Sequence, residues 1–164
     1  MPLPLLLALA SAHARFCNVE NAHYALRTQP SVTASFRDVD SGRDWPSGLA
    51  MRLHIGATGR SFWFLPWNGG SSGSQHLAST EDVTKRGWHP PDPDGGPRPI
   101  GDLEFIATDK GYDLWDHVPV RGEIAPAHLL IPDLANVLSH QLPSGRGAST
   151  VRQFFDLADC RRRS

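Results

Sequence analysis

A glycine- and serine-rich segment carries the most familiar catalytic pattern in the chain. Residues 69–73 read Gly-Gly-Ser-Ser-Gly and match G-x-S-x-G, the turn that presents the nucleophilic serine of α/β-hydrolases. That turn requires a helix directly behind the serine and a parallel sheet that carries an Asp and a His further along the chain. The residues that follow, Ser74 to Asp82, are polar, and the chain is short for that fold. We therefore predict a flexible loop here, and the sequence assigns no catalytic nucleophile.

Carboxylates and histidines gather in region 88–117. Asp92 and Asp94 resemble the start of a calcium-binding loop, but a proline separates them and no bidentate Glu follows at the required distance. We expect an acidic, solvated surface, with no metal site and no cofactor. An alternative stays open, in which an acidic residue and a His of this region, such as Asp116 and His117, serve a small hydrolase as acid and base.

Five tryptophans are the residues most suggestive of binding. An indole face flanked by polar side chains provides a platform for a sugar ring, and the polar neighbours bond the hydroxyl groups. We predict that one face of a hairpin and the loop from Trp88 to Pro99 together line the main pocket. The predicted ligand-binding residues are Arg52, His54, Trp63, Trp67, Trp88 and His89. The opposing interpretation is that Trp63 and Trp115 belong to the core.

The composition of the 164 residues excludes several classes of protein. With 40% hydrophobic and 20% charged residues, the chain lacks the signature of disorder. A net charge of -1 excludes a uniformly basic nucleic-acid-binding protein, so we expect no nucleic acid partner. The 15 glycines and 14 prolines leave little room for long helices and favour short strands and turns. The segment from Glu81 to Asp133 is acidic, and the residues on either side of it are basic.

The N-terminus resembles a secretion signal. An apolar run from Leu3 to Ala10 is followed by the A-x-A triplet at Ala12 to Ala14, which is typical of a cleavage site. The run is too short for a membrane span, which needs about 20 apolar residues. We therefore expect residues 1–14 to be a signal segment, residues 15–164 to be a single globular domain, and the protein to be periplasmic or extracellular.

The two cysteines lie near the two ends of the predicted mature domain. Cys17 follows the proposed cleavage site by three residues, and Cys160 precedes the C-terminus by four. Exported proteins use cysteines in disulfides, and no C-x-x-C or third cysteine suggests redox catalysis or zinc binding. We predict a disulfide between Cys17 and Cys160.

The clearest element is a hairpin. Apolar residues alternate with polar ones from Leu49 to Ile55, a turn follows at 56–59, and a second apolar run extends from Arg60 to Trp67. A four-residue turn places Ile55 opposite Arg60 and sets the register of the remaining pairs. The expected core pairs are Leu53 with Phe62 and Met51 with Phe64, and the opposite face pairs Arg52 with Trp63 and His54 with Ser61.

The remaining elements indicate the fold class. Further strands are expected at 22–27, 31–38, 102–108 and 150–157, and one helix should begin near Pro132 and bury Leu134, Val137, Leu138 and Leu142. Short strands between turn residues favour antiparallel connections. We predict a mainly β fold, an antiparallel sandwich or partly open barrel with one short C-terminal helix, with an α+β fold as the alternative.

The function expected from these features is that of an exported or envelope-associated binding module. Its aromatic surface would take a polar ligand such as a glycan. Two alternatives remain open, the small hydrolase described above and a structural protein that packs the second face of the hairpin on a partner chain. The sequence leaves the oligomeric state open.

Overall fold

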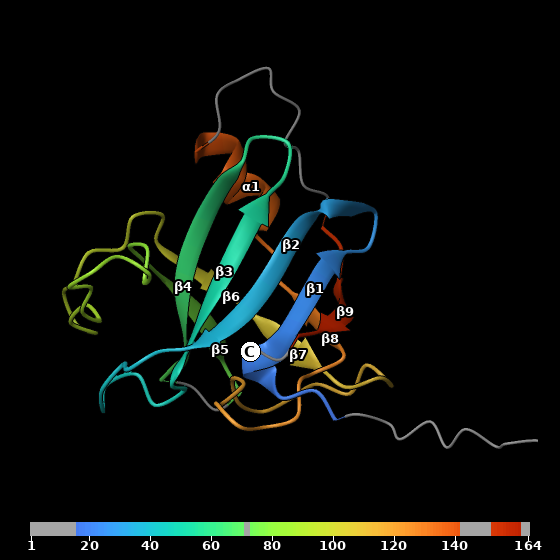
Figure 1. The fold of residues 1–164 in the computed structure, drawn as a ribbon, viewed down its shortest axis with the longest axis horizontal. Helices are drawn as coiled ribbons and strands as arrows, with labels where there is room; N and C mark the ends of the chain where they lie inside the picture. The colour runs from blue at the N-terminus through green and yellow to red at the C-terminus, as the bar shows by residue number, and fades with distance from the viewer. Residues whose placement is uncertain (1–15, 71–72, 142–151, 162–164) are drawn as a thin grey trace, which may run out of the picture.

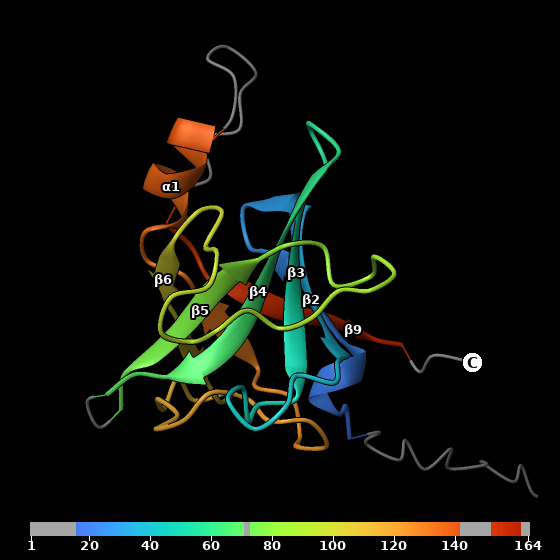
Figure 2. The ribbon, with the colours of Figure 1, turned by 90° about the vertical axis from the view of Figure 1, so that its left-hand side faces the viewer.

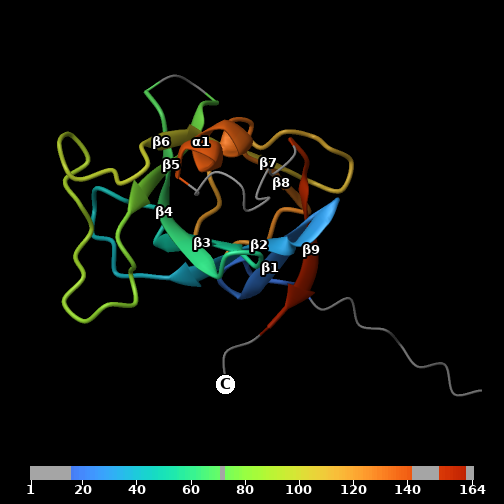
Figure 3. The same ribbon diagram turned by 90° about the horizontal axis from the view of Figure 1, so that it is seen from above.

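Nine antiparallel strands form one sheet that curls into a nearly closed barrel (Figure 1). The computed structural model describes residues 16–70, 73–141 and 152–161. The order across the sheet is β6-β5-β4-β3-β2-β1-β9-β8-β7. Seen from above, the strands surround a common centre (Figure 3). The strands are β1 (Ala22–Leu26), β2 (Gln29–Asp38), β3 (Leu49–Ile55), β4 (Arg60–Asn68), β5 (Gln75–Thr80), β6 (Asp102–Glu104), β7 (Ile106–Thr108), β8 (His128–Leu130) and β9 (Phe155–Cys160).

The strands at the two edges of the sheet are β6 and β7, and in the chain only Phe105 separates them. Phe105 donates its amide to Gln75 O at 2.9 Å, so the chain stays close to β5 while it changes partner from β5 to β8. The predicted strand 102–108 is therefore real but divided at Phe105. The mainly β fold with one short helix is confirmed.

The hairpin of β3 and β4 has the predicted register. Met51 pairs with Phe64, Leu53 with Phe62 and Ile55 with Arg60. The turn is closed by the amide of Gly59, which donates to Ile55 O at 2.9 Å, and Gly59 has a φ of 68° that favours glycine. Phe64 is fully buried, whereas Phe62, expected in the core, is partly buried and packs against it.

The barrel interior is filled by apolar side chains. Its largest fully buried members include Tyr24, Phe64, Phe105 and Phe155. The helix α1 (Leu134–Gln141) lies at one end of the barrel (Figure 1) and adds Leu134 and Leu138 to this cluster. The predicted Leu142 lies outside the described residues.

Three strands differ from the sequence expectation. β5 and β8 were not predicted, and the last strand begins at Phe155 instead of residue 150. Gln75–Thr80 was taken as polar loop, yet Gln75, Leu77, Ala78, Ser79 and Thr80 are all buried. Both faces of the strand are covered, because Leu77 packs in the barrel core and Ala78 in an apolar cluster on the outer face. Residues 71–72 and 150–151, which also fall in these predictions, lie outside the described residues.

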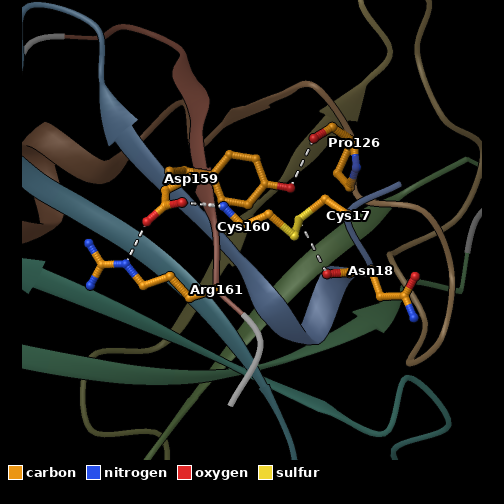
Figure 4. Close-up of a disulfide and its surroundings, with 7 residues drawn as sticks. Cys17, Asn18, Pro126, Asp159, Cys160 and Arg161 are labelled. Carbon is orange, nitrogen blue, oxygen red and sulfur yellow. Dashed lines mark hydrogen bonds and ion pairs between the residues drawn. A yellow bond between two sulfur atoms is a disulfide. The ribbon is translucent and has the colours of Figure 1, made fainter. Parts of the chain in front are cut away.

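The predicted disulfide between Cys17 and Cys160 is present (Figure 4). Cys160 ends β9, and its partner across the ladder is Ala22 at the start of β1. The segment around Cys17 is also held by Ala125, whose amide donates to Cys17 O at 2.7 Å. The bond thus joins the first described segment to a strand that pairs with β1 and β8 in the barrel.

A second apolar cluster lies outside the barrel, on the opposite face of β3, β4 and β5. It contains Trp45, Ala50, Trp63, Leu65 and Ala78. The loop between β5 and β6 crosses this face in front of β3 and β4 (Figure 2), and Val83 and Trp88 from it pack on the cluster. The second apolar face of the hairpin is therefore covered by the chain itself.

Among the described residues, no helix is long and apolar enough to cross a lipid bilayer.

Candidate functional site

A row of five side chains crosses the outer face of the barrel. Each member is the ladder partner of the next, from one strand to its neighbour. The row consists of His23 on β1, Ser35 on β2, Arg52 on β3, Trp63 on β4 and Thr80 on β5. Strand alternation produces it, because residues that flank a core residue in a strand point to the opposite face.

This row lines an open groove with a volume of about 810 Å³. Charged residues at its sides come from β2, the start of β4 and the chain after β5. They are the cations Arg37, Arg60 and Lys85 and the carboxylates of Glu81 and Asp82. With Arg52, the groove is lined by four lysine and arginine side chains and two carboxylates.

Arg52 is positioned by Ser61, which lies on the neighbouring strand β4. Its Nε donates to Ser61 Oγ at 3.0 Å, and His54 Nδ1 lies 3.0 Å from the same oxygen. His54 is not part of the groove lining, but its ring contacts Ser61, which is. Only Nε of Arg52 makes a hydrogen bond to a described residue, so its two terminal nitrogens are unbonded there.

Asp82 is fixed as an anion by the turn that follows β5. The Thr84 hydroxyl donates to Asp82 Oδ1 at 2.6 Å and the Thr84 amide does so at 2.9 Å. These bonds, helped by the charges of Lys85 and Arg52, hold the pKa of Asp82 below its usual range. Asp82 therefore accepts hydrogen bonds at neutral pH and is no candidate for a general acid.

The structure distributes the six predicted ligand residues over different places. Arg52 and Trp63 line the groove, and Trp63 is 8% exposed. Trp67 packs on the outer cluster and stacks on His76 with ring centroids 5.0 Å apart. Trp88 and His89 line a separate small cavity of about 240 Å³.

The loop 88–99 lies over the outer face as expected, but of its residues Pro99 alone is found in the groove lining. The indoles fill the space between the loops and the sheet: Trp88 Nε1 donates to Thr80 Oγ1 at 3.3 Å, and Trp45 Nε1 donates to Pro91 O at 2.9 Å. The site thus differs from the predicted aromatic platform, because the tryptophans bury their surfaces against each other and leave the groove to polar side chains.

Arg98 holds the far part of this loop together. Its guanidinium lies 5.1 Å from the Trp45 ring centroid and donates to four backbone carbonyls, at 3.1 to 3.4 Å. It also pairs with Asp102 at 3.3 Å. Gly96 is required at the turn, since a Cβ there would lie 2.6 Å from Asp92 O. The proline-rich loop is thus a built structure with Arg98 at its centre.

Sequence reasoning missed a second polar cluster, which is built on β8, β9 and the turns after β1 and β7. Arg27 donates to both carboxylate oxygens of Asp156 at 2.8 Å and to the Tyr112 hydroxyl at 2.8 Å. His128 Nδ1 lies 2.7 Å from Asp156 Oδ1, and its ring stacks on Tyr112 at 4.4 Å. The Arg27 guanidinium, followed by His128, lowers the pKa of Asp156.

Tyr112 in this cluster has a φ of 67°, in the left-handed region that is unfavourable for a bulky residue. The contacts with Arg27 and His128 offset that cost and fasten the turn after β7 to β8 and β9. The members come from positions 27, 112, 128 and 156, so no spacing in the sequence could have revealed the cluster. Its opposite charges compensate each other, which fits a structural latch.

The pair proposed for a hydrolase, Asp116 and His117, is in contact. His117 Nδ1 lies 2.8 Å from Asp116 Oδ1, and its Nε2 lies 3.3 Å from Glu123 Oε1. The Asp116 carboxylate, together with Glu123, raises the pKa of His117. A carboxylate lies at each ring nitrogen, so both nitrogens of the imidazole are already engaged within the loop. The arrangement favours a clasp within the loop 116–123.

The acidic residues of the β5–β6 loop serve local structure. Asp92 Oδ1 accepts the amide of Asp94 at 2.9 Å, which is the geometry of an Asx turn. Within the described part of the chain, no group of three or more His, Cys, Asp or Glu could hold a metal ion.

Compared with models of protein families, with curated proteins and with solved structures, the chain gives no significant match. The function must therefore be argued from the groove itself.

Proposed function

We propose that the protein is an exported binding module that takes a polar, ring-containing ligand such as a glycan in the groove on the outer face of β1 to β5. The observation that carries this proposal is the row from His23 to Thr80, which lines a groove of about 810 Å³. That volume lies within the range of small-molecule sites, roughly 300 to 1,000 Å³.

The lining supports a polar ligand over a lipid. It offers the hydroxyl groups of Ser35 and Thr80, the free end of Arg52 and the carboxylates of Glu81 and Asp82. Sugar hydroxyls act as donors and as acceptors, so they match a groove that contains both kinds of partner. Affinity would come from hydrogen bonds and charge, with Trp63 contributing an edge of its ring.

Export is part of the proposal for two reasons. The N-terminal apolar run ends in an A-x-A triplet, and the disulfide between Cys17 and Cys160 is of the kind that persists in oxidising compartments. The site of action would be the periplasm or the extracellular space.

The test is binding of neutral and acidic oligosaccharides, and of a fatty acid as the apolar comparison, to the isotope-labelled protein. We expect oligosaccharides to shift the amide signals of Ser35, Arg52 and Thr80, and the fatty acid to leave them unchanged. Ser35→Trp should abolish binding, because an indole in the middle of the row fills the groove. Thr28→Trp adds the same side chain at an exposed turn and should bind as the wild type does.

The unfolding midpoint of each variant shows that its fold is intact. Unchanged binding in the folded Ser35→Trp variant would place the ligand elsewhere. No signal shift with any of the saccharides would refute a glycan-binding function.

A further inference from the structure

We infer that the groove selects acidic saccharides, sugars that carry an anionic oxygen group such as a carboxylate or a sulfate. This inference rests on the proposed function and adds the chemical class of the ligand. It follows from the charges of the groove, from how Arg52 is held and from the position of the two carboxylates.

Three cations of the groove have no carboxylate within ion-pair distance among the described residues. Arg37, Arg52 and Lys85 form no ion pair within 4 Å with any carboxylate of the described residues. Elsewhere in the same part of the chain, Arg27, Arg98, Arg152 and Arg161 each pair with an aspartate. In a chain of net charge -1, three unpaired cations in one groove raise the local potential toward anions.

Arg52 is prepared for an anionic group. Ser61 Oγ accepts from its Nε, which fixes the plane of the guanidinium and leaves the two terminal nitrogens unbonded among the described residues. Those two nitrogens form a fork that matches two oxygens of one carboxylate or sulfate. A hydroxyl group offers a single oxygen and uses half of this fork.

Arg37 supplies a second reason. Its Nε is buried and has no hydrogen-bond partner among the described residues, although its guanidinium lines the groove. A charged group with an unsatisfied buried donor is costly, and an anion placed at its exposed end reduces that cost. Arg37 follows Ser35 by two positions on β2, so both point to the outer face. Ser35 is the ladder partner of Arg52, and Arg37 is the partner of Ala50, two positions before Arg52 on β3.

The carboxylates argue against a nucleic acid. Glu81 and Asp82 lie in the same groove, and Asp82 stays ionised because Thr84 donates two hydrogen bonds to it. They repel a chain of phosphates, but they accept hydrogen bonds from sugar hydroxyls. A ligand with one anionic group and several hydroxyls satisfies both the cations and the carboxylates of the groove.

The test compares oligosaccharides of equal length by calorimetry: a neutral glucan, an oligogalacturonate with carboxylates, and a sulfated chondroitin fragment. A single-stranded oligonucleotide is the fourth ligand. We expect at least one acidic sugar to bind about tenfold or more tightly than the neutral one, which is what one or two charge-assisted hydrogen bonds provide. The carboxylated and sulfated arms decide which anionic group is preferred.

Variants connect the preference to the groove. Arg52→Ala should reduce the affinity for the acidic sugar about tenfold and the affinity for the neutral sugar by a smaller factor, because a hydroxyl group uses half of the fork. Arg52→Lys keeps the charge without the fork, so its affinity for the acidic sugar should lie between those of the wild type and Arg52→Ala. Arg43→Ala removes an exposed arginine outside the groove and should change nothing.

The outcomes separate the two proposals. Equal affinity for neutral and acidic sugars overturns the acidic preference and leaves the glycan-binding function standing. Tighter binding of the oligonucleotide overturns the saccharide class. Absence of binding to every ligand overturns both.

Discussion

Removal of the disulfide is the perturbation whose size can be worked out most directly. Cys17 and Cys160 are 143 positions apart, so the bond closes nearly the whole described chain into one loop. In the chain-entropy model, a loop of that length removes about 5 kcal/mol of unfolded-state entropy at 25 °C. For a domain of this size, such a loss corresponds to a decrease in Tm of roughly 10 to 20 °C.

The double variant Cys17→Ser/Cys160→Ser should still fold, because β9 keeps its ladders with β1 and β8. The Cys17 carbonyl also keeps the amide of Ala125. Equilibrium unfolding in urea, followed by tryptophan fluorescence, measures the change in free energy of unfolding. Cys17→Ala/Cys160→Ala is the matched control for local packing, since Cys17 is 7% exposed and a serine there buries a hydroxyl.

If loop entropy dominates, the serine and the alanine double variants lose the same several kcal/mol in free energy of unfolding. Reduced wild type should then unfold close to the two variants. A loss below about 1 kcal/mol in both pairs would refute the entropic account, and it would mean that the unfolded chain already keeps its ends together. A large difference between the serine and alanine pairs would assign the effect to packing around residue 17.

Three further changes test other parts of the structure. Phe64→Ala should lower the free energy of unfolding by about 3 to 5 kcal/mol, because the ring is fully buried. Phe62→Ala should cost less, because that ring is only partly buried, and equal losses would contradict this difference. Arg98→Ala should release the β5–β6 loop and speed hydrogen exchange at the Gly96 amide, and unchanged protection would show that the carbonyl contacts are dispensable. His117 has a pKa raised above the usual 6.5, so its clasp stabilises the fold at low pH and is lost as the pH rises through the raised pKa. His117→Gln should therefore lower Tm at about pH 5.5 and have little effect at about pH 9, and equal effects at both would refute the charged clasp.

The parts of the fold that could be predicted from sequence are those where side-chain alternation is strong. In the hairpin, Leu53 and Arg52 occupy opposite faces, and the register followed from the turn length alone. The disulfide followed from the position of the two cysteines. Strand β5 could not be read in this way, because both of its faces are buried and Ser79 and Thr80 use their hydroxyls locally.

The candidate site was predicted less well for a related reason. The sequence located the outer face of the hairpin and two of its groove residues, Arg52 and Trp63. It did not show which indoles would be covered, since that depends on how the loop is folded by Arg98 and on the contact of Trp45 with Pro91. Tertiary contacts between distant segments turned a predicted aromatic platform into a second core.

The packing of the barrel decides where a ligand can bind. Barrels that hold a ligand inside need an interior that side chains leave open. Here the rings of Tyr24, Phe64, Phe105 and Phe155 fill the interior, and Leu138 from α1 joins them. The Tyr24 hydroxyl also uses its donor on Pro126 O at 2.9 Å, so it has no proton to offer to a guest. The proposed polar ligand would therefore bind outside the barrel, where the row through Arg52 carries charge that the apolar interior could not accommodate.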